Sequence, residues 1–263
     1  MPWHDRTEGP TATSASIQRS MPRTLLLFMM VLLIAGCRKE HDPPQPDPTP
    51  ATPSPVHTLR MDHHVDGQPL IFDSLMYMND AGHAYSITRL EYYISDLHLI
   101  GASSHSVDGP YYVNARNGTT VELSALPIGV HDSASLLLGL PPGLNTTGGL
   151  PVTMENNAMA WPEPMGGGYH FIKLEGHFMN GNNSSGYAMH IGMDEFLAHC
   201  VMPDPIDIDA PPGELVLRFN INEIFRTPHN YDLSTGNYSM GSMMLMGQLR
   251  DNLTDAFTLT YEP

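Results

Sequence analysis

The stretch MAWPEPMGGGYHFIKLEGHFMNGNNSSGYAMHIG, residues 159–192, decides the fold that the sequence predicts. From Tyr169 to Phe178, and again from Gly186 to Gly192, the residues alternate with the period of two that is typical of β-strands. Between these runs, residues 180–185 are Asn, Gly and Ser, which favour turns. The stretch therefore predicts a β-hairpin whose loop lies in solvent.

The histidines of this hairpin indicate a metal site. The alternation places His170 on the same face as the aliphatic residues Ile172 and Leu174. On the second strand, His190 has small residues two positions away on either side, which leaves room for an ion. Imidazole is a common ligand of transition metals. His170 and His190 are therefore candidate ligands.

Short alternating segments separated by Gly and Pro continue on both sides of the hairpin. The segment 85–100 is too long for one typical strand, so we expect a bulge or bend near Ser95 and Asp96. No long helical pattern alternates with the strands, which predicts an all-β fold, an antiparallel β-sandwich-like domain over residues 56–263. The other expected strands are residues 59–66, 71–78, 111–115, 119–123, 130–138 and 215–221.

A short C-terminal helix is expected where Met240, Met243, Met244 and Leu249 recur at helical spacing. Methionine fills irregular gaps in cores, so the favoured interpretation is a helix that packs these side chains on the core. The alternative is a soft-metal relay, because thioethers bind Cu(I).

Two further residues have competing interpretations. Residues 59–66 predict a first strand with His63 inward and His64 outward, and an inward His is more often a hydrogen-bonded core residue than a ligand. Cys200 follows His199, which allows a metal or thiolate role, but a buried structural cysteine is the favoured interpretation.

The N-terminal part has the pattern of a bacterial lipoprotein signal over residues 21–37. Arg19 and Arg23 precede an apolar run that ends in Leu-Ile-Ala-Gly before Cys37, so we expect Cys37 to carry lipid and to anchor the protein in the cell envelope, at the outer membrane, facing the periplasm or the surface. The alternative is an ordinary secretory signal with an incidental cysteine. Residues 1–20 are expected to be unstructured or to precede a true start at Met21, and residues 38–55 form a proline-rich linker.

The formal net charge is −16, and the whole excess of acidic over basic residues lies after residue 55. Such a surface repels phosphate backbones, which argues against nucleic acid as a partner. No phosphate-binding loop, nucleophile elbow or His-Glu-x-x-His motif is present, and scattered carboxylates in an acidic chain are normally solvated. We therefore expect no enzymatic activity.

Several motifs occur in order along the chain and together span most of residues 57–260. They are Asp62-His63-His64-Val65-Asp66-Gly67, Tyr92-Tyr93-Ile94-Ser95-Asp96, Met159-Ala160-Trp161, residues 168–176 (GYHFIKLEG), His190-Ile191-Gly192, and Phe225-Arg226-Thr227-Pro228 with Tyr231-Asp232. In this order they resemble the motifs of the MbnP-like copper-binding family, the periplasmic and surface proteins related to the methanobactin-associated MbnP.

The resemblance implies a β-rich fold and a mononuclear copper site with two imidazoles, at His63 and His190. It also implies that Trp161 is oxidised to kynurenine by a partner di-haem enzyme of the cytochrome c peroxidase type. The chain departs from the family pattern in the Pro-Glu-Pro that follows Trp161 and in His170, where a Lys is common. His170 thereby becomes an extra or substitute ligand.

Asp62 and Glu175 lie near these histidines in sequence and are the expected acceptors that fix the imidazole tautomers. The function expected from the sequence is a membrane-anchored, copper-binding lipoprotein that acquires, stores or handles copper. The alternative is a surface β-sandwich that binds a partner or ligand without metal. The metal content of the purified protein separates the two.

Overall fold

The computed structural model describes residues 55–263. The predictions for residues 1–20, for the lipoprotein signal with Cys37, and for the linker as far as residue 54 lie outside the described residues. Among residues 55–263, no helix combines the length and the apolar character needed to cross a bilayer.

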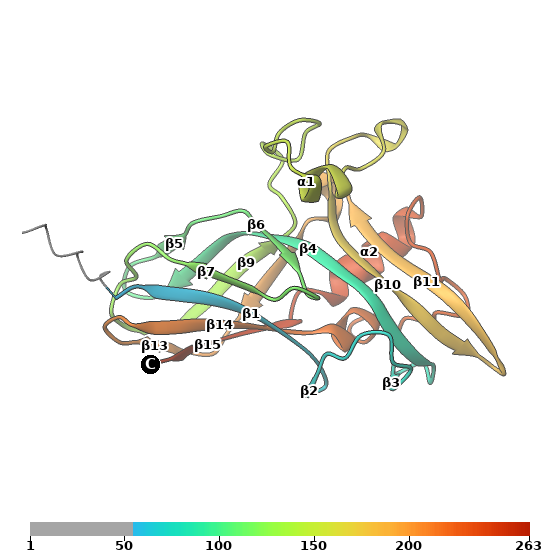
Figure 1. The fold of residues 1–263 in the computed structure, drawn as a ribbon, viewed down its shortest axis with the longest axis horizontal. Helices are drawn as coiled ribbons and strands as arrows, with labels where there is room; N and C mark the ends of the chain where they lie inside the picture. The colour runs from blue at the N-terminus through green and yellow to red at the C-terminus, as the bar shows by residue number, and fades with distance from the viewer. Residues whose placement is uncertain (1–54) are drawn as a thin grey trace, which may run out of the picture. The chain divides into compact units, whose positions relative to one another are not determined.

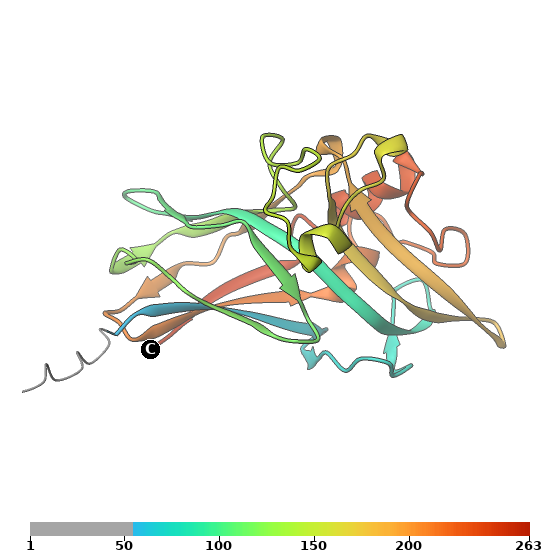
Figure 2. The ribbon, with the colours of Figure 1, turned by 45° about the horizontal axis from the view of Figure 1, so that its top comes forward.

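The larger sheet is organised around β4 (Ala84–Ile100), the long strand that runs through the middle of the domain in Figures 1 and 2. On one side of β4, β10 (His170–Asn180) and β11 (Asn183–Gly192) form the predicted hairpin, with β11 at the edge. On the other side follow β9 (Ser133–Leu138) and β12 (Ala198–Met202), and all these pairs are antiparallel. The short strands that also pair with β4 are β3 (Tyr77–Met78), β5 (His105–Val107) and β6 (Tyr111–Asn114).

The second sheet contains β15 (Phe257–Glu262), β14 (Gly213–Asn220), β1 (His57–Val65) and β2 (Gln68–Pro69), in that order, and β7 (Thr119–Glu122) also pairs with β1. β1 and β14 are parallel, whereas the other pairs are antiparallel. A small two-stranded sheet is formed by β8 (Gly129–His131) and β13 (Ile206–Ile208).

The helical segments are short. The predicted C-terminal helix is α2 (Met243–Asn252), and the side-chain oxygen of Ser242 accepts a hydrogen bond from the backbone of Leu245, which satisfies one of the free N–H groups at the start of the helix. The other helical segments are α1 (Met154–Ala158) and the 3₁₀ turns η1 (Glu163–Met165), η2 (Asp194–Phe196) and η3 (Ile221–Phe225).

The two large sheets meet in a core of aliphatic and aromatic side chains. Tyr92 of β4 contacts Phe219 of β14 with ring centres 5.6 Å apart, and Phe219 stacks on Phe257 of β15 at 4.6 Å. Burial of each such phenylalanine stabilises the fold by about 1.5–3 kcal/mol. On β1, buried and half-buried positions alternate, so His63 points inward and His64 outward, as predicted. The predicted β-sandwich is confirmed.

The predicted strand at residues 71–78 is wrong in most of its length, because only Tyr77–Met78 pairs with β4. Asp73 has a φ of 62°, a conformation that interrupts an extended strand. Ile71 and Leu75 are exposed, so no sheet covers this segment.

Two other expectations concern interruptions in strands. The bulge predicted near Ser95 and Asp96 is confirmed by a register shift between Ser95 and His98 and by the φ of 49° at Asp96. Residues 130–138 form two strands instead of one, because β8 pairs with β13 while β9 pairs with β4.

The favoured interpretation of the C-terminal methionines is also wrong. Met246 and Leu249 are the residues of α2 that pack on the core. Met240, Met243 and Met244 instead have 41, 49 and 68% of their surface exposed. The helix begins only at Met243, and the side of the helix that faces the core carries Met246 and Leu249.

Candidate metal centre

A β-bulge in β10 brings the two hairpin histidines to one face of the sheet. His170 lies opposite Gly192, but Ile172 lies opposite Ile191, so β10 contains one extra residue between these pairs. Gly192 shares a face with His190, and His170 therefore joins it there. The predicted placement of His170 beside Ile172 is wrong for this reason, since one inserted residue reverses the face of every residue before it.

The imidazoles of His170 and His190 are in contact. Their ring centres are 5.1 Å apart, and the ring planes are nearly perpendicular, at 88°. His170 is buried, whereas 15% of the side chain of His190 is exposed. The pair is thus shielded on one side and open on the other.

Trp161 covers the buried end of the pair. Its ring centre lies 4.7 Å from that of His170, and only 2% of the residue is exposed. A Cβ at position 192 would lie 2.5 Å from Cε3 of Trp161, so Gly192 is required for the indole to pack there. The space that the sequence predicts beside His190 is therefore occupied by Trp161, whose Nε1 donates to the carbonyl of Met165 at 3.1 Å.

Each imidazole has one nitrogen held by an acceptor. Nδ1 of His170 lies 3.0 Å from the carbonyl oxygen of Met159, and Nε2 of His190 lies 2.8 Å from Oε1 of Glu175. Both acceptors require a proton on the nitrogen that they contact, which leaves Nε2 of His170 and Nδ1 of His190 as the nitrogens that a metal would bind. Such an outer hydrogen bond is the usual support of a histidine that binds a metal. The predicted contact of Glu175 with a site histidine is confirmed.

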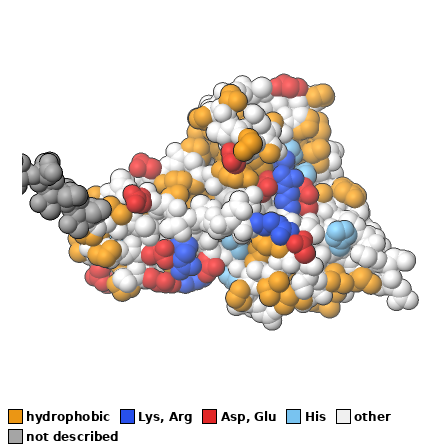
Figure 3. Space-filling model, viewed as in Figure 1, with side chains coloured by type: hydrophobic (Ala, Val, Ile, Leu, Met, Phe, Trp, Pro, Cys, Tyr) orange, Lys and Arg blue, Asp and Glu red, His pale blue; other side chains and the backbone are white. Residues whose placement is uncertain are grey.

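The surroundings of the pair keep His170 unprotonated. Burial, assisted by the positive charge of Lys173, lowers the pKa of His170 to about 3, so this imidazole is neutral at physiological pH. The hydrogen bond from His190, together with the charge of Arg89, holds the pKa of Glu175 below its usual value against the effect of burial. Arg89 pairs with both Glu175 and Glu91, and Figure 3 shows basic side chains flanked by acidic ones on this face of the domain.

The sequence assigns no role at the site to two of its residues, although Lys173 lies within the 168–176 motif. Lys173 lies opposite His190 in the register, and its ammonium donates to the carbonyl of Ala158, which ties the segment before Trp161 to the sheet. Ser239 accepts a hydrogen bond from the backbone N–H of His190 and donates one to its carbonyl, both at 2.7 Å. Both contacts depend on tertiary structure, so only the fold reveals them.

His63 does not join this cluster. Its Nε2 lies 2.9 Å from the hydroxyl of Tyr92, which lies opposite Ile172 and so on the core side of the larger sheet. His190 lies opposite Lys173 and therefore on the other side. The sheet thus separates His63 from His190, and burial lowers the pKa of His63 to about 4.

The other residues considered as ligands or their partners, Asp62, Cys200 and His199, have no contact with the histidine pair among the hydrogen bonds of the described residues. Asp62 accepts a hydrogen bond from the backbone N–H of His63, and no hydrogen bond joins it to the ring. Cys200 is buried and its thiol donates to the carbonyl of Leu253, while burial raises the pKa of the thiol to about 12. The favoured structural interpretation of Cys200 is confirmed. His199 is exposed on the opposite face of its strand.

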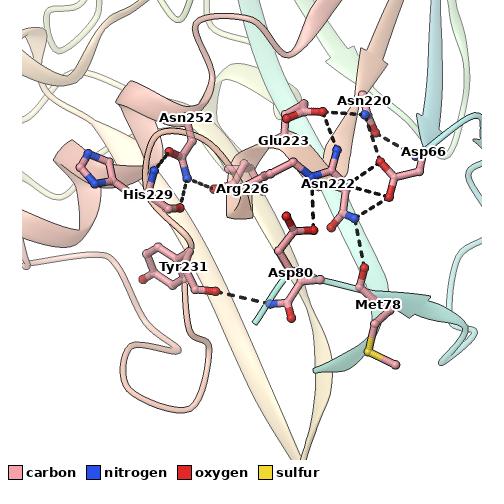
Figure 4. Close-up of polar contacts among 12 residues, drawn as sticks. Asp66, Met78, Asp80, Asn220, Asn222, Glu223, Arg226, His229, Tyr231 and Asn252 are labelled. Carbon is pink, nitrogen blue, oxygen red and sulfur yellow. Dashed lines mark hydrogen bonds and ion pairs between the residues drawn. The ribbon is translucent and has the colours of Figure 1, made fainter. Parts of the chain in front are cut away.

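Two motifs that carry the family resemblance meet in a polar network away from the histidine pair (Figure 4). Both terminal oxygens of Asp66 lie 2.9 Å from Nη2 of Arg226, and Asn222 also donates to Asp66, at 2.7 Å. Burial alone would raise the pKa of Asp66, but these hydrogen bonds hold it below its usual value. Arg226 also pairs with Glu223 and Asp80, so the network fastens the turn after β1 to η3.

The donor set at the histidine pair fits a transition metal. An imidazole bound at about 2 Å has its ring centre about 3 Å from the ion, so two rings at a tetrahedral angle have centres about 5 Å apart. The 5.1 Å separation of His170 and His190 is close to this value, which is also usual for two rings in edge-to-face contact. Within residues 55–263, no group of three or more His, Cys, Asp or Glu side chains is arranged to hold a metal ion, so His170 and His190 are joined by no third side chain of these types.

Fold and site together define a β-sandwich protein with a paired-histidine centre beside a buried tryptophan. The sequence model of the MbnP family matches residues 53–244, and the chain belongs to this family. A solved structure, MbnP from Methylosinus trichosporium, matches at 15% identity with a TM-score of 0.41, over 68% of this chain and 80% of that chain. A search of curated proteins finds no match.

Proposed function

We propose that this MbnP-family protein binds copper through His170 and His190 and handles the metal without catalysing a reaction. The observation that carries the proposal is the pair of contacting imidazoles, 5.1 Å apart, with a fixed acceptor on the outer nitrogen of each ring. Neutral imidazole binds copper in either oxidation state, whereas calcium and magnesium prefer oxygen ligands. The acidic surface favours the approach of cations.

This proposal replaces His63 with His170 as the second imidazole. His63 is hydrogen-bonded to Tyr92 on the opposite face of the larger sheet from His190. In this position His63 and His190 do not share a site. The contact of His170 with His190 supports its choice as the second imidazole, as does its departure from the family pattern.

We also propose that Trp161 is oxidised to kynurenine by a di-haem enzyme of the cytochrome c peroxidase type. The position of the indole beside His170 supports this, as does a hollow of about 200 Å³ that is lined by Trp161 and Tyr169. The intact mass of the protein, expressed with and without such a partner, tests it. Identical masses, with Trp161 unmodified in both, would refute it.

The cellular location is a further part of the proposal: the protein is lipid-anchored through Cys37 to the outer membrane of the bacterial envelope. The support is the basic and apolar run that ends in Ala-Gly-Cys. In the Cys37→Ala variant we expect the protein to leave the membrane fraction with its circular dichroism unchanged. Continued membrane association of a folded variant would contradict the anchor.

The copper site itself is tested by titration against a competing chelator. His170→Ala and His190→Ala should each weaken binding by about a hundredfold or more, because one of two imidazoles is lost. His64→Ala is the matched control, since His64 is half-buried on β1 and lies outside the cluster. Unchanged affinity in both hairpin variants would refute the site, and a preference for zinc over copper would refute the choice of metal.

A further inference from the structure

The loop that precedes α2 runs along the free edge of β11 and is fastened at the metal centre. The N–H of Ala188 donates to the carbonyl of Asn237, and the N–H of Ser239 donates to the carbonyl of Ala188. The hydroxyl of Ser239 then holds both backbone groups of His190. Met240 is the next residue of the chain, so a thioether follows directly after the contact with a proposed copper ligand.

A second thioether, that of Met165, lies against the same loop. Met165 belongs to η1, and its carbonyl accepts the hydrogen bond from the indole of Trp161. A Cβ at Gly241 would lie 3.9 Å from Cε of Met165, so the end of the Met165 side chain lies against this loop. Met165 therefore connects the segment of Trp161 with the loop of Met240.

Three methionines in this loop and at the start of α2 are exposed to solvent. Met240, which precedes α2, and Met243 and Met244 in α2 are all exposed, although Met246 of α2 is completely buried. Packing of the core thus accounts for Met246 and leaves the other three without a role in the fold. We call Met165, Met240, Met243 and Met244 the methionine surface.

We propose that the methionine surface receives Cu(I) and passes it to His170 and His190, an inference that rests on the proposed function of that pair. Thioethers are soft ligands that select Cu(I) over Cu(II) and over zinc. Among the described residues no third His, Cys, Asp or Glu completes the histidine pair. The methionine surface is linked to the pair through Ser239, which holds the backbone of His190 and directly precedes Met240. The methionine surface gives the centre a preference for the reduced ion during loading.

The test compares loading rates for the two oxidation states. The full-length protein is mixed anaerobically with Cu(I) as its bicinchoninate complex, or with Cu(II) as its glycine complex, and uptake is followed by absorbance. The variant replaces all four residues of the methionine surface with Leu, which keeps the apolar volume and removes the sulfur. The control is Met76→Leu with Met78→Leu, two exposed methionines at and beside β3.

We expect the fourfold variant to take up Cu(I) about tenfold more slowly, with the final copper content and the rate for Cu(II) unchanged. The control variant should load at the rate of the unmodified protein. An unchanged Cu(I) rate would overturn the proposal, and so would an equal slowing for Cu(I) and Cu(II), which would indicate an altered fold. If the unmodified protein takes up neither ion, the histidine site is refuted together with the methionine surface, whereas normal uptake at an unchanged rate refutes the methionine surface alone.

Discussion

Replacing Glu175 with Gln tests the hydrogen bond that orients His190. The carboxylate accepts from Nε2 of His190 at 2.8 Å and also pairs with Arg89 at 3.4 Å. Gln keeps the length and one acceptor oxygen but removes the negative charge that makes the opposite ring nitrogen a better ligand. Loss of such a partner typically weakens metal binding by about 10–100-fold. Because 30% of the Glu175 side chain is exposed, we expect the lower end, about tenfold or ~1.4 kcal/mol.

The matched control is Glu91→Gln. Glu91 pairs with Arg89 at 2.7 Å on the same face of the sheet, but it has no hydrogen bond to either imidazole. Both variants are titrated with copper against a competing chelator, after thermal unfolding has shown that each is folded. Equal affinities of the two variants would refute the role assigned to Glu175, since charge removal alone would then explain any loss.

Three further predictions concern packing, pH and the thiol. Gly192→Ala should lower stability by about 1–3 kcal/mol and shift the fluorescence of Trp161, because the added Cβ would overlap the indole; Gly143→Ala, with open space around it, is the control, and equal losses would contradict the packing. The pKa of His63 is about 4 in the folded protein against a usual 6.5, so the unfolded state binds more protons between these values and the free energy of unfolding should fall as the pH drops through this window, by up to about 1.4 kcal/mol per pH unit. Urea unfolding of His63→Gln should show a shallower slope there, and an identical slope would argue against the assignment. Finally, the thiol of Cys200 should react with a thiol reagent only after unfolding, in a variant that lacks Cys37, and fast labelling of the folded protein would contradict its burial.

The sequence predicts much of the fold because strand alternation is a local property. The β10–β11 hairpin, the inward direction of His63 and the irregularity near Ser95 all follow from patterns of a few residues. The strand expected at residues 71–78 is wrong because a strand also needs a neighbouring strand to pair with. The apolar residues of this segment do not reveal whether such a neighbour exists, and only Tyr77–Met78 has one.

The site is harder to predict, because its geometry depends on register. A single extra residue in β10 moves His170 to the face of His190, and no feature of the sequence between Tyr169 and Ile172 marks that bulge. Likewise, the separation of His63 from His190 depends on which face of the sheet each strand presents to the core. The motifs nevertheless mark residues that matter, although Asp66 and Arg226 serve the fold through their network.

The paired-imidazole centre is tested most directly by the anomalous scattering of crystals of the copper-loaded protein, measured on both sides of the copper absorption edge. We predict one strong copper peak within bonding distance of both His170 and His190, on the side of the larger sheet that carries Glu175. A copper peak at His63, or peaks that do not touch both hairpin histidines, would contradict it.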